Sequence, residues 1–136
     1  MTRVLIVEDD AAIATILAML LGMLGFDAAT AADGAQALRI LAAGPRPDAL
    51  LLDIRLPSCG PDGVTLARMV RARADGARIA VLLMTAESYD EDGTLLEAGA
   101  DAFIRKPVPD ADELATLIRR HVEKRARSPH TRGIQR

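Results

Sequence analysis

Acidic residues directly follow two apolar segments of this sequence. Glu8 and Asp9 follow the run RVLIV, and Asp53 ends the run ALLLD. Each run is too short for a helix and too apolar for a loop, so both are predicted to be strands buried on both faces. Ligands of an open parallel sheet bind outside the carboxyl ends of its strands, and an unpaired buried carboxylate is costly. These acids are therefore candidates for chemistry.

Two further polar side chains come at the ends of similar segments. Thr85 follows the apolar run from Ile79 to Met84, and Lys106 follows the run from Ala102 to Arg105. Carboxylates at one sheet edge repel one another unless a cation joins them, and an all-oxygen cluster suits Mg2+. Lys106 adds a positive charge and Thr85 a hydroxyl donor. The set predicts a magnesium-dependent site for a transferred phosphoryl group, whose chemistry needs positioning and charge neutralisation.

The segments between the strands have helical periodicity. Helices are predicted near 11–24, 34–43, 64–73, 90–98 and 111–124, with a weaker strand at 26–30. Strands that alternate with helices imply βαβ units, so the predicted fold is an α/β protein with a doubly wound, five-stranded parallel sheet. In the first helix the apolar spacing predicts the inward residues Ile13, Ile16, Leu17, Leu20, Leu21 and Leu24.

Composition limits the possible partners and the domain count. The 136 residues are half hydrophobic with a formal net charge of -2, which fits one domain and gives no global field for nucleic acid or a membrane. A single cysteine and the lack of a signal-peptide or membrane-spanning pattern predict a cytoplasmic protein. We expect one folded domain over 1–124 and a basic, disordered tail over 125–136, because the tail lacks core-forming residues.

Four motifs, VLIVEDD, LLLDIRLP, LLMTAE and AGADAFIRKP, occur in this order and resemble those of bacterial response-regulator receiver domains. The resemblance covers Thr2 to about Lys124 and implies the flavodoxin-like (βα)5 fold with strand order 2-1-3-4-5. It also implies that Asp53 is the phosphoacceptor and that Thr85 and Lys106 contact the phosphoryl oxygens. The implied Mg2+ ligands are Glu8, Asp9, Asp53 and the backbone carbonyl of Arg55.

The same resemblance implies residues for a conformational switch and for control of dephosphorylation, and the chain departs from the family pattern in one loop. Thr85 and Phe103 occupy the switch positions, while Arg55 and Glu87 flank the path of the water that hydrolyses the acyl phosphate. Between Pro57 and Asp62 this chain has four residues where the common family pattern has two, so the loop beside the site is enlarged.

The implied function is that of a single-domain response regulator in a phosphorelay. A sensor histidine kinase or histidine phosphotransfer protein would phosphorylate Asp53, which switches binding to a downstream protein target. Such a domain is not a separate enzyme, because it catalyses only its own phosphorylation and dephosphorylation. One alternative is the receiver portion of a longer DNA-binding regulator. Another is an aspartyl-phosphate hydrolase or a topoisomerase-primase-like metal domain, but both typically need a second acid two positions after the first, where this chain has Arg55.

The first predicted helix lacks charge, since no residue from Ala11 to Phe26 is ionisable. An exposed apolar helix face marks an interaction site. We expect the phosphodonor protein to dock on its outward residues Thr15, Ala18 and Gly22. Self-association into a weak homodimer is the alternative use of this face.

Overall fold

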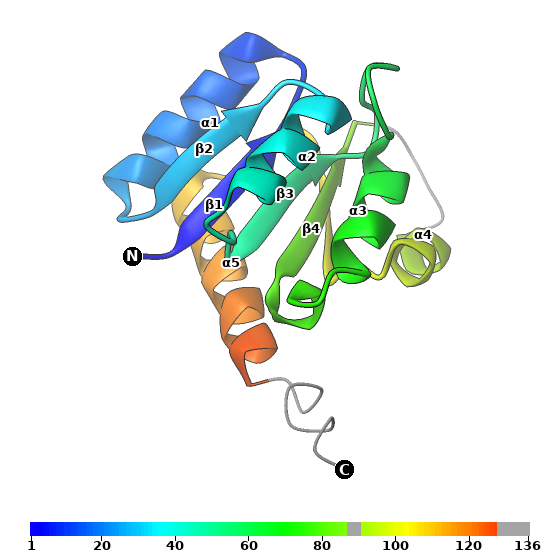
Figure 1. Cartoon of the computed structure of the whole chain (residues 1–136). Coiled ribbons are helices and arrows are strands. Elements are labelled where there is room, and N and C mark those ends of the chain that lie inside the picture. Colours follow the sequence, from blue (N-terminus) through cyan, green and yellow to red (C-terminus); the bar gives the residue numbers. More distant parts are fainter. Residues whose placement is uncertain (87–90, 128–136) are drawn as a thin grey trace.

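The computed structural model describes residues 1–86 and 91–127, excluding the side chains at 91, 92, 95 and 96. A parallel sheet of five strands lies between helices, in the predicted order β2-β1-β3-β4-β5 (Figure 1). The elements are β1 (Arg3–Val7), α1 (Ala11–Met23), β2 (Asp27–Ala31), α2 (Gly34–Ala43), β3 (Ala49–Asp53), α3 (Gly63–Arg71), a short 3-10 turn (Gly76–Arg78), β4 (Ala80–Thr85), α4 (Glu91–Ala98), β5 (Ala102–Arg105) and α5 (Ala111–Ala126).

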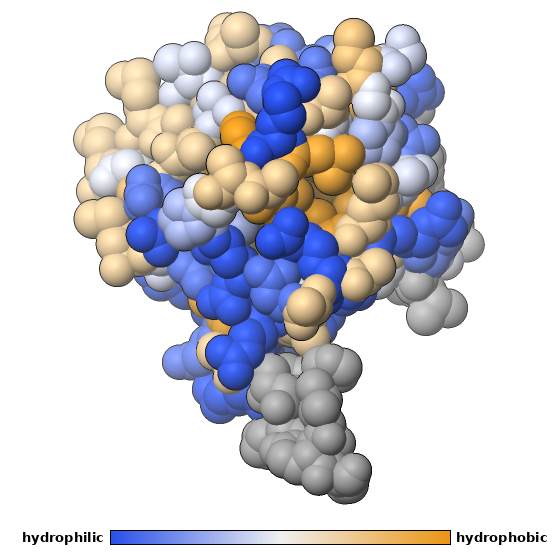
Figure 2. All heavy atoms as spheres, in the orientation of Figure 1, coloured by the Kyte–Doolittle hydropathy of each residue, from blue (hydrophilic) through white to orange (hydrophobic). Residues whose placement is uncertain are grey.

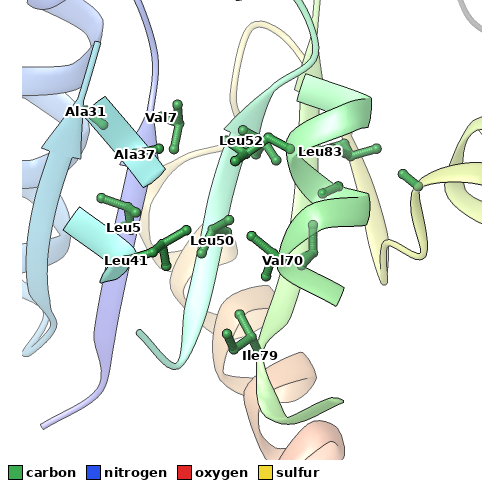
Figure 3. Close-up of a cluster of buried hydrophobic side chains, with 14 of the residues drawn as sticks. Leu5, Val7, Ala31, Ala37, Leu41, Leu50, Leu52, Val70, Ile79 and Leu83 are labelled. Atoms are coloured by element: carbon green, nitrogen blue, oxygen red, sulfur yellow. The ribbon is translucent and has the colours of Figure 1, made fainter. Parts of the chain in front are cut away.

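Each face of the sheet builds its own core. Strand residues alternate between the faces, so Leu5 and Leu50 point toward α2 and α3, whereas Val4 and Leu51 point toward α1 and α5. Figure 3 shows the first core, in which Ala37 and Leu41 of α2 and Val70 of α3 pack on the sheet. Burial on both faces explains why β1, β3 and β4 are continuous apolar runs.

Helix α1 has a different orientation from the predicted one. Its buried residues are Ala14, Leu17 and Leu21, whereas Ile16 and Leu20 are 56% and 38% exposed. The prediction was wrong for Ile16 and Leu20 because α1 is apolar around most of its circumference, so periodicity cannot select one stripe.

The predicted outward face of α1 is also corrected at one position. Ala18 is half-buried and packs against the core beneath α1, whereas Thr15 and Gly22 are exposed as expected. The inward side of α1 thus combines the small residues Ala14 and Ala18 with Leu17 and Leu21. Asp10, rather than Asp9, caps α1 by accepting from the amides of Ala12 and Ile13 at 3.0 and 3.1 Å.

The last helix runs past the expected domain boundary. Residues 125 and 126 were expected in the tail but belong to α5, because the Arg125 guanidinium contacts Asp101 at 2.6 Å. Arg127 is the C-terminal cap residue of α5, and residues 128–136 of the predicted tail lie outside the described residues. Among the helices that the structure describes, none combines the length and apolarity needed to cross a bilayer.

Candidate functional site

Four polar side chains converge at the carboxyl edge of the sheet. Asp53 and Thr85 are the last residues of β3 and β4, Glu8 follows β1, and Lys106 follows β5. Glu8, Asp53 and Thr85 are only 2%, 6% and 1% exposed. The adjacent strands β1 and β3 begin crossovers in opposite directions, and this switch point is where doubly wound sheets bind their ligands. The strand order therefore brings together residues that are far apart in the sequence.

Lys106 joins the two buried acids. Its Nζ donates to Glu8 Oε1 at 2.6 Å and to Asp53 Oδ2 at 3.0 Å. Burial disfavours the charged ammonium, but the hydrogen bonds to both carboxylates outweigh that effect and raise the pKa of Lys106. The Lys106 amide donates to the Thr85 carbonyl at 2.7 Å, which holds the chain after β5 beside the end of β4. Lys106 is thus a fixed positive charge at the site.

The predicted acidic cluster is present. Glu8, Asp9 and Asp53 each offer a carboxylate oxygen, and these oxygens all lie within 4.8 Å of one another. Asp9 is exposed, so the cluster is open to solvent on one side. The next acid, Asp10, caps α1 and is not part of this cluster. An open, all-oxygen set with few protein ligands fits Mg2+, which keeps several waters.

Backbone amides orient the two buried carboxylates. The Arg55 amide donates to Asp53 Oδ1 at 3.0 Å, and the Asp10 amide donates to Glu8 Oε2 at 3.1 Å. Asp53 thereby presents one oxygen to the loop after β3 and the other to Lys106. The Arg55 side chain is exposed, while its backbone lies directly beside Asp53.

The predicted switch residues lie on neighbouring strands. Phe103 of β5 pairs in register with Leu83 of β4, two residues before Thr85. Phe103 is half-buried and packs on the core beneath α2 and α3, whereas Thr85 is fully buried. Glu87, the other half of the predicted gate with Arg55, lies outside the described residues.

An apolar groove beside Lys106 is a feature that the sequence did not reveal. It has a volume of about 420 Å³ and lies between α1 and the segment before α5, lined by Ile13, Ile16, Leu20, Pro107, Val108 and Pro109 among others. The α1 side of the molecule is pale to orange in Figure 2, while blue residues gather over the lower part. Sequence reasoning missed the groove because it placed Ile16 and Leu20 in the core. The run PVP after Lys106 was an available signal of apolar residues in a loop.

Comparisons with known proteins agree with this geometry. Residues 4–119 match the family model described as the response regulator receiver domain. The transcriptional regulatory protein PrrA of Mycobacterium tuberculosis is 41% identical over 121 residues, which cover 87% of this chain and 50% of PrrA. The DNA-binding response regulator MtrA of Mycobacterium leprae is 38% identical over 116 residues, covering 85% of this chain and 49% of MtrA. The chain therefore spans about half the length of these curated relatives.

A solved structure adds a chemical observation. The receiver domain of a sensor histidine kinase from Pseudomonas aeruginosa is 33% identical, with a TM-score of 0.77 that covers 90% of this chain and 98% of that one. That structure contains a magnesium ion coordinated in its active site cleft.

Proposed function

Because this chain belongs to the response regulator receiver domain family of two-component systems, we propose that it accepts a phosphoryl group on Asp53 in a magnesium-dependent reaction. The donor is a phosphohistidine on a sensor histidine kinase or a histidine phosphotransfer protein. Phosphorylation then switches binding to a downstream protein. In this role the chain is a phosphoacceptor that catalyses only its own phosphorylation and dephosphorylation.

One observation carries the proposal: a buried Asp53 carboxylate lies between an acidic cluster and the Lys106 ammonium. Oδ2 of Asp53 is 3.0 Å from Lys106 Nζ, and its carboxylate is within 4.8 Å of the oxygens of Glu8 and Asp9. A structural ion pair alone would need only the two carboxylates that Lys106 contacts, and not the third carboxylate of Asp9 beside them. A site that receives a phosphoryl group does need a nucleophilic oxygen with positive charges on both sides of the transferred group.

In the proposed reaction, an oxygen of Asp53 attacks phosphorus in line with the phosphorus–nitrogen bond of the phosphohistidine. That bond breaks as the new phosphorus–oxygen bond forms, and the electron pair leaves with the imidazole. Lys106 neutralises charge on the phosphoryl oxygens, and the Thr85 hydroxyl donates to them. The Arg55 amide keeps Asp53 in one orientation. Water later hydrolyses the acyl phosphate and regenerates the carboxylate.

The donor set fits a resident Mg2+ ion held by Glu8, Asp9, Asp53 and the Arg55 backbone carbonyl. When bound, the ion supplies charge neutralisation for the transferred group. The protein's own part is to keep Glu8 and Asp53 buried and fixed, which their bonds to Lys106 and to backbone amides accomplish.

A second candidate function has support from the relatives. PrrA and MtrA are named as transcriptional and DNA-binding regulators, and this chain covers only half of each. The chain would then be the receiver portion of a longer regulator of that kind, with the same Asp53 chemistry controlling an attached output domain. Whether the open reading frame continues into a DNA-binding domain discriminates between the two candidates.

The test of the proposed chemistry uses a small phosphodonor. Acetyl phosphate with Mg2+ should raise the intact mass by one phosphate group, and Asp53→Ala should abolish the increase. The exposed acid Asp27 provides a matched control, because it begins β2 at the amino edge of the sheet, opposite the edge that carries the site. Asp9→Asn should raise the Mg2+ concentration needed for half-maximal labelling, since it replaces one charged carboxylate ligand with a neutral amide. Equal labelling of Asp53→Ala and the unmodified chain would refute the assignment.

A further inference from the structure

The loop from Arg55 to Asp62, between β3 and α3, packs on the first turn of α2. The Ala35 amide donates to the Cys59 carbonyl at 3.1 Å. A Cβ on Gly34 would lie 2.3 Å from the Pro61 carbonyl oxygen, and one on Gly60 would lie 2.4 Å from the Ala35 nitrogen. The two backbones therefore meet so closely that glycine is required at both positions. This contact plays no part in the chemistry described above.

The contact satisfies an amide that α2 cannot satisfy itself. Ala35 is the second residue of α2, and the first amides of a helix have no acceptor within the helix. Asp33 caps α2 by accepting from the Gln36 amide at 2.8 Å, which leaves the Ala35 amide to the loop. The exchange behaviour of the Ala35 amide thus reports directly on whether the loop is docked.

The docked loop also links the two sides of the acidic cluster. The β1–β3 ladder ends at Val7 and Leu52, one residue before Glu8 and Asp53, so both acids lie beyond the sheet pairing that joins their strands. The Glu8 amide donates to the Ala31 carbonyl at 3.0 Å, and Ala31 ends β2 just before α2.

On the Asp53 side of the cluster, a backbone hydrogen bond joins the two ends of the loop. The Gly63 amide donates to the Ile54 carbonyl at 3.0 Å, and the position of a Cβ on Gly63 is only 2.3 Å from the Asp53 carbonyl oxygen. A route of backbone contacts therefore runs from Glu8 through the start of α2 and the loop to Asp53.

We propose that this loop-to-α2 contact positions the Asp53 and Arg55 side of the cation site against the Glu8 and Asp9 side. Gly34 and Gly60 are then positioning residues for Mg2+ binding, although neither touches the ion. The inference rests on the proposed function, because it assumes that the acidic cluster binds Mg2+. Residues that hold the ligands of a metal in place typically change its affinity by roughly 10–100-fold when they are altered.

The main variant is Gly60→Ala, and Gly25→Ala is its matched control. Both glycines have left-handed φ angles, 105° and 95°, so alanine introduces similar backbone strain at each. A Cβ on Gly25 meets nothing within 4 Å, whereas one on Gly60 meets α2. Ala35→Pro is the second variant, because proline is tolerated in the first turn of a helix and cannot donate the amide hydrogen bond to the Cys59 carbonyl.

Amide NMR on one sample shows whether the variant is folded, whether the loop is docked on α2 and how tightly Mg2+ binds. In Gly60→Ala the Ala35 amide should lose its protection from hydrogen exchange. The Mg2+ dissociation constant should rise about tenfold in Gly60→Ala and in Ala35→Pro, the low end of the range for such positioning contacts. Gly25→Ala should bind as the unmodified chain does. Saturating Mg2+ should restore the rate of labelling by acetyl phosphate in both loop variants.

Two results separate this inference from the proposed function. The role of the loop would be overturned, and the proposed function left intact, if the unmodified chain binds Mg2+ and both loop variants bind it as tightly as Gly25→Ala does. Failure of the unmodified chain to bind Mg2+ would overturn the proposed metal dependence, and the inference with it.

Discussion

Lys106 determines the charge balance of the site at the scale of single residues. Two buried carboxylates share its ammonium, at 2.6 and 3.0 Å, and the shared bonds raise its pKa against the effect of burial. A lysine held in this way keeps its charge throughout the neutral range. The same cation that compensates Glu8 and Asp53 is then already in place for an incoming phosphoryl group.

Lys106→Ala should slow labelling of Asp53 by acetyl phosphate about 100-fold, a typical loss when one charge-stabilising donor is removed. Mg2+ binding should persist, because all its proposed ligands remain. We also expect Mg2+ to raise the melting temperature more in this variant than in the unmodified chain, since the ion replaces the missing positive charge. Lys106→Arg keeps the charge but changes its shape, and it serves as the control. A labelling rate unaffected by Lys106→Ala would contradict the role given to this residue.

Among the helices, α1 exposes a row of large apolar side chains. Met19 and Met23 are 62% and 80% exposed, next to Ile16 and Leu20. The helix begins directly after the acidic cluster, and its apolar side continues into the groove beside Lys106. We propose that the phosphodonor docks on this side of α1, which is formed by Ile16, Met19, Leu20 and Met23 with Thr15 and Gly22 at its edge. This face replaces the expected one that included the half-buried Ala18. A donor that brings a phosphohistidine to Asp53 must cover the sheet edge where α1 starts.

Met19→Glu should slow phosphotransfer from a protein donor by about 10–100-fold, because an unpaired carboxylate would be desolvated in the contact. The donor for this measurement is the sensor kinase of the host that phosphorylates the unmodified chain fastest. Labelling by acetyl phosphate should be unchanged, since a small donor needs no docking. Ala42→Glu places the same charge at an exposed position of α2 and is the control. Equal losses with both donors, or no loss with either, would rule out α1 as the docking face.

At the scale of the whole molecule, a second charged network secures the opposite end of the sheet. Asp101 lies just before β5 and accepts from Arg71 of α3 at 3.3 Å and from Arg125 of α5 at 2.6 Å. Its carboxylate also accepts from the Val81 amide of β4 at 2.9 Å. Arg71 donates in addition to the Gly99 carbonyl at 2.9 Å. One acid thus connects helices from both faces of the sheet, far from the site at the carboxyl edge.

Asp101→Asn should lower the free energy of unfolding by about 2 to 4 kcal/mol, because it leaves two largely buried guanidinium groups without their common partner. Chemical denaturation measures this loss. The pair of Arg73 and Asp75, at 2.9 Å with both side chains 33% exposed, provides the comparison. Asp75→Asn should cost no more than about 1 kcal/mol. The rate of labelling by acetyl phosphate should be the same in both variants below their unfolding temperatures. A slower rate in Asp101→Asn alone would show that the network also acts on the site.

The order of the elements, the parallel sheet and the residues at its carboxyl edge could be predicted from the sequence. Buried parallel strands require continuous apolar runs, so β1, β3 and β4 are visible as RVLIV, ALLLD and AVLLMT. Since the carboxyl ends of parallel strands meet at one edge, Lys106 could be expected near Glu8, although the two residues are 98 positions apart.

The contacts between these elements became visible only in the folded molecule. In α1 nearly every position is apolar, so periodicity cannot select the side that the helix buries. The groove beside Lys106 and the docking of Gly60 on α2 likewise each involve a loop, 107–110 or 55–62, whose sequence carries no periodic signal. Local patterns follow from the spacing of residues along one element. Contacts between elements depend on shape and steric fit, which periodicity does not encode.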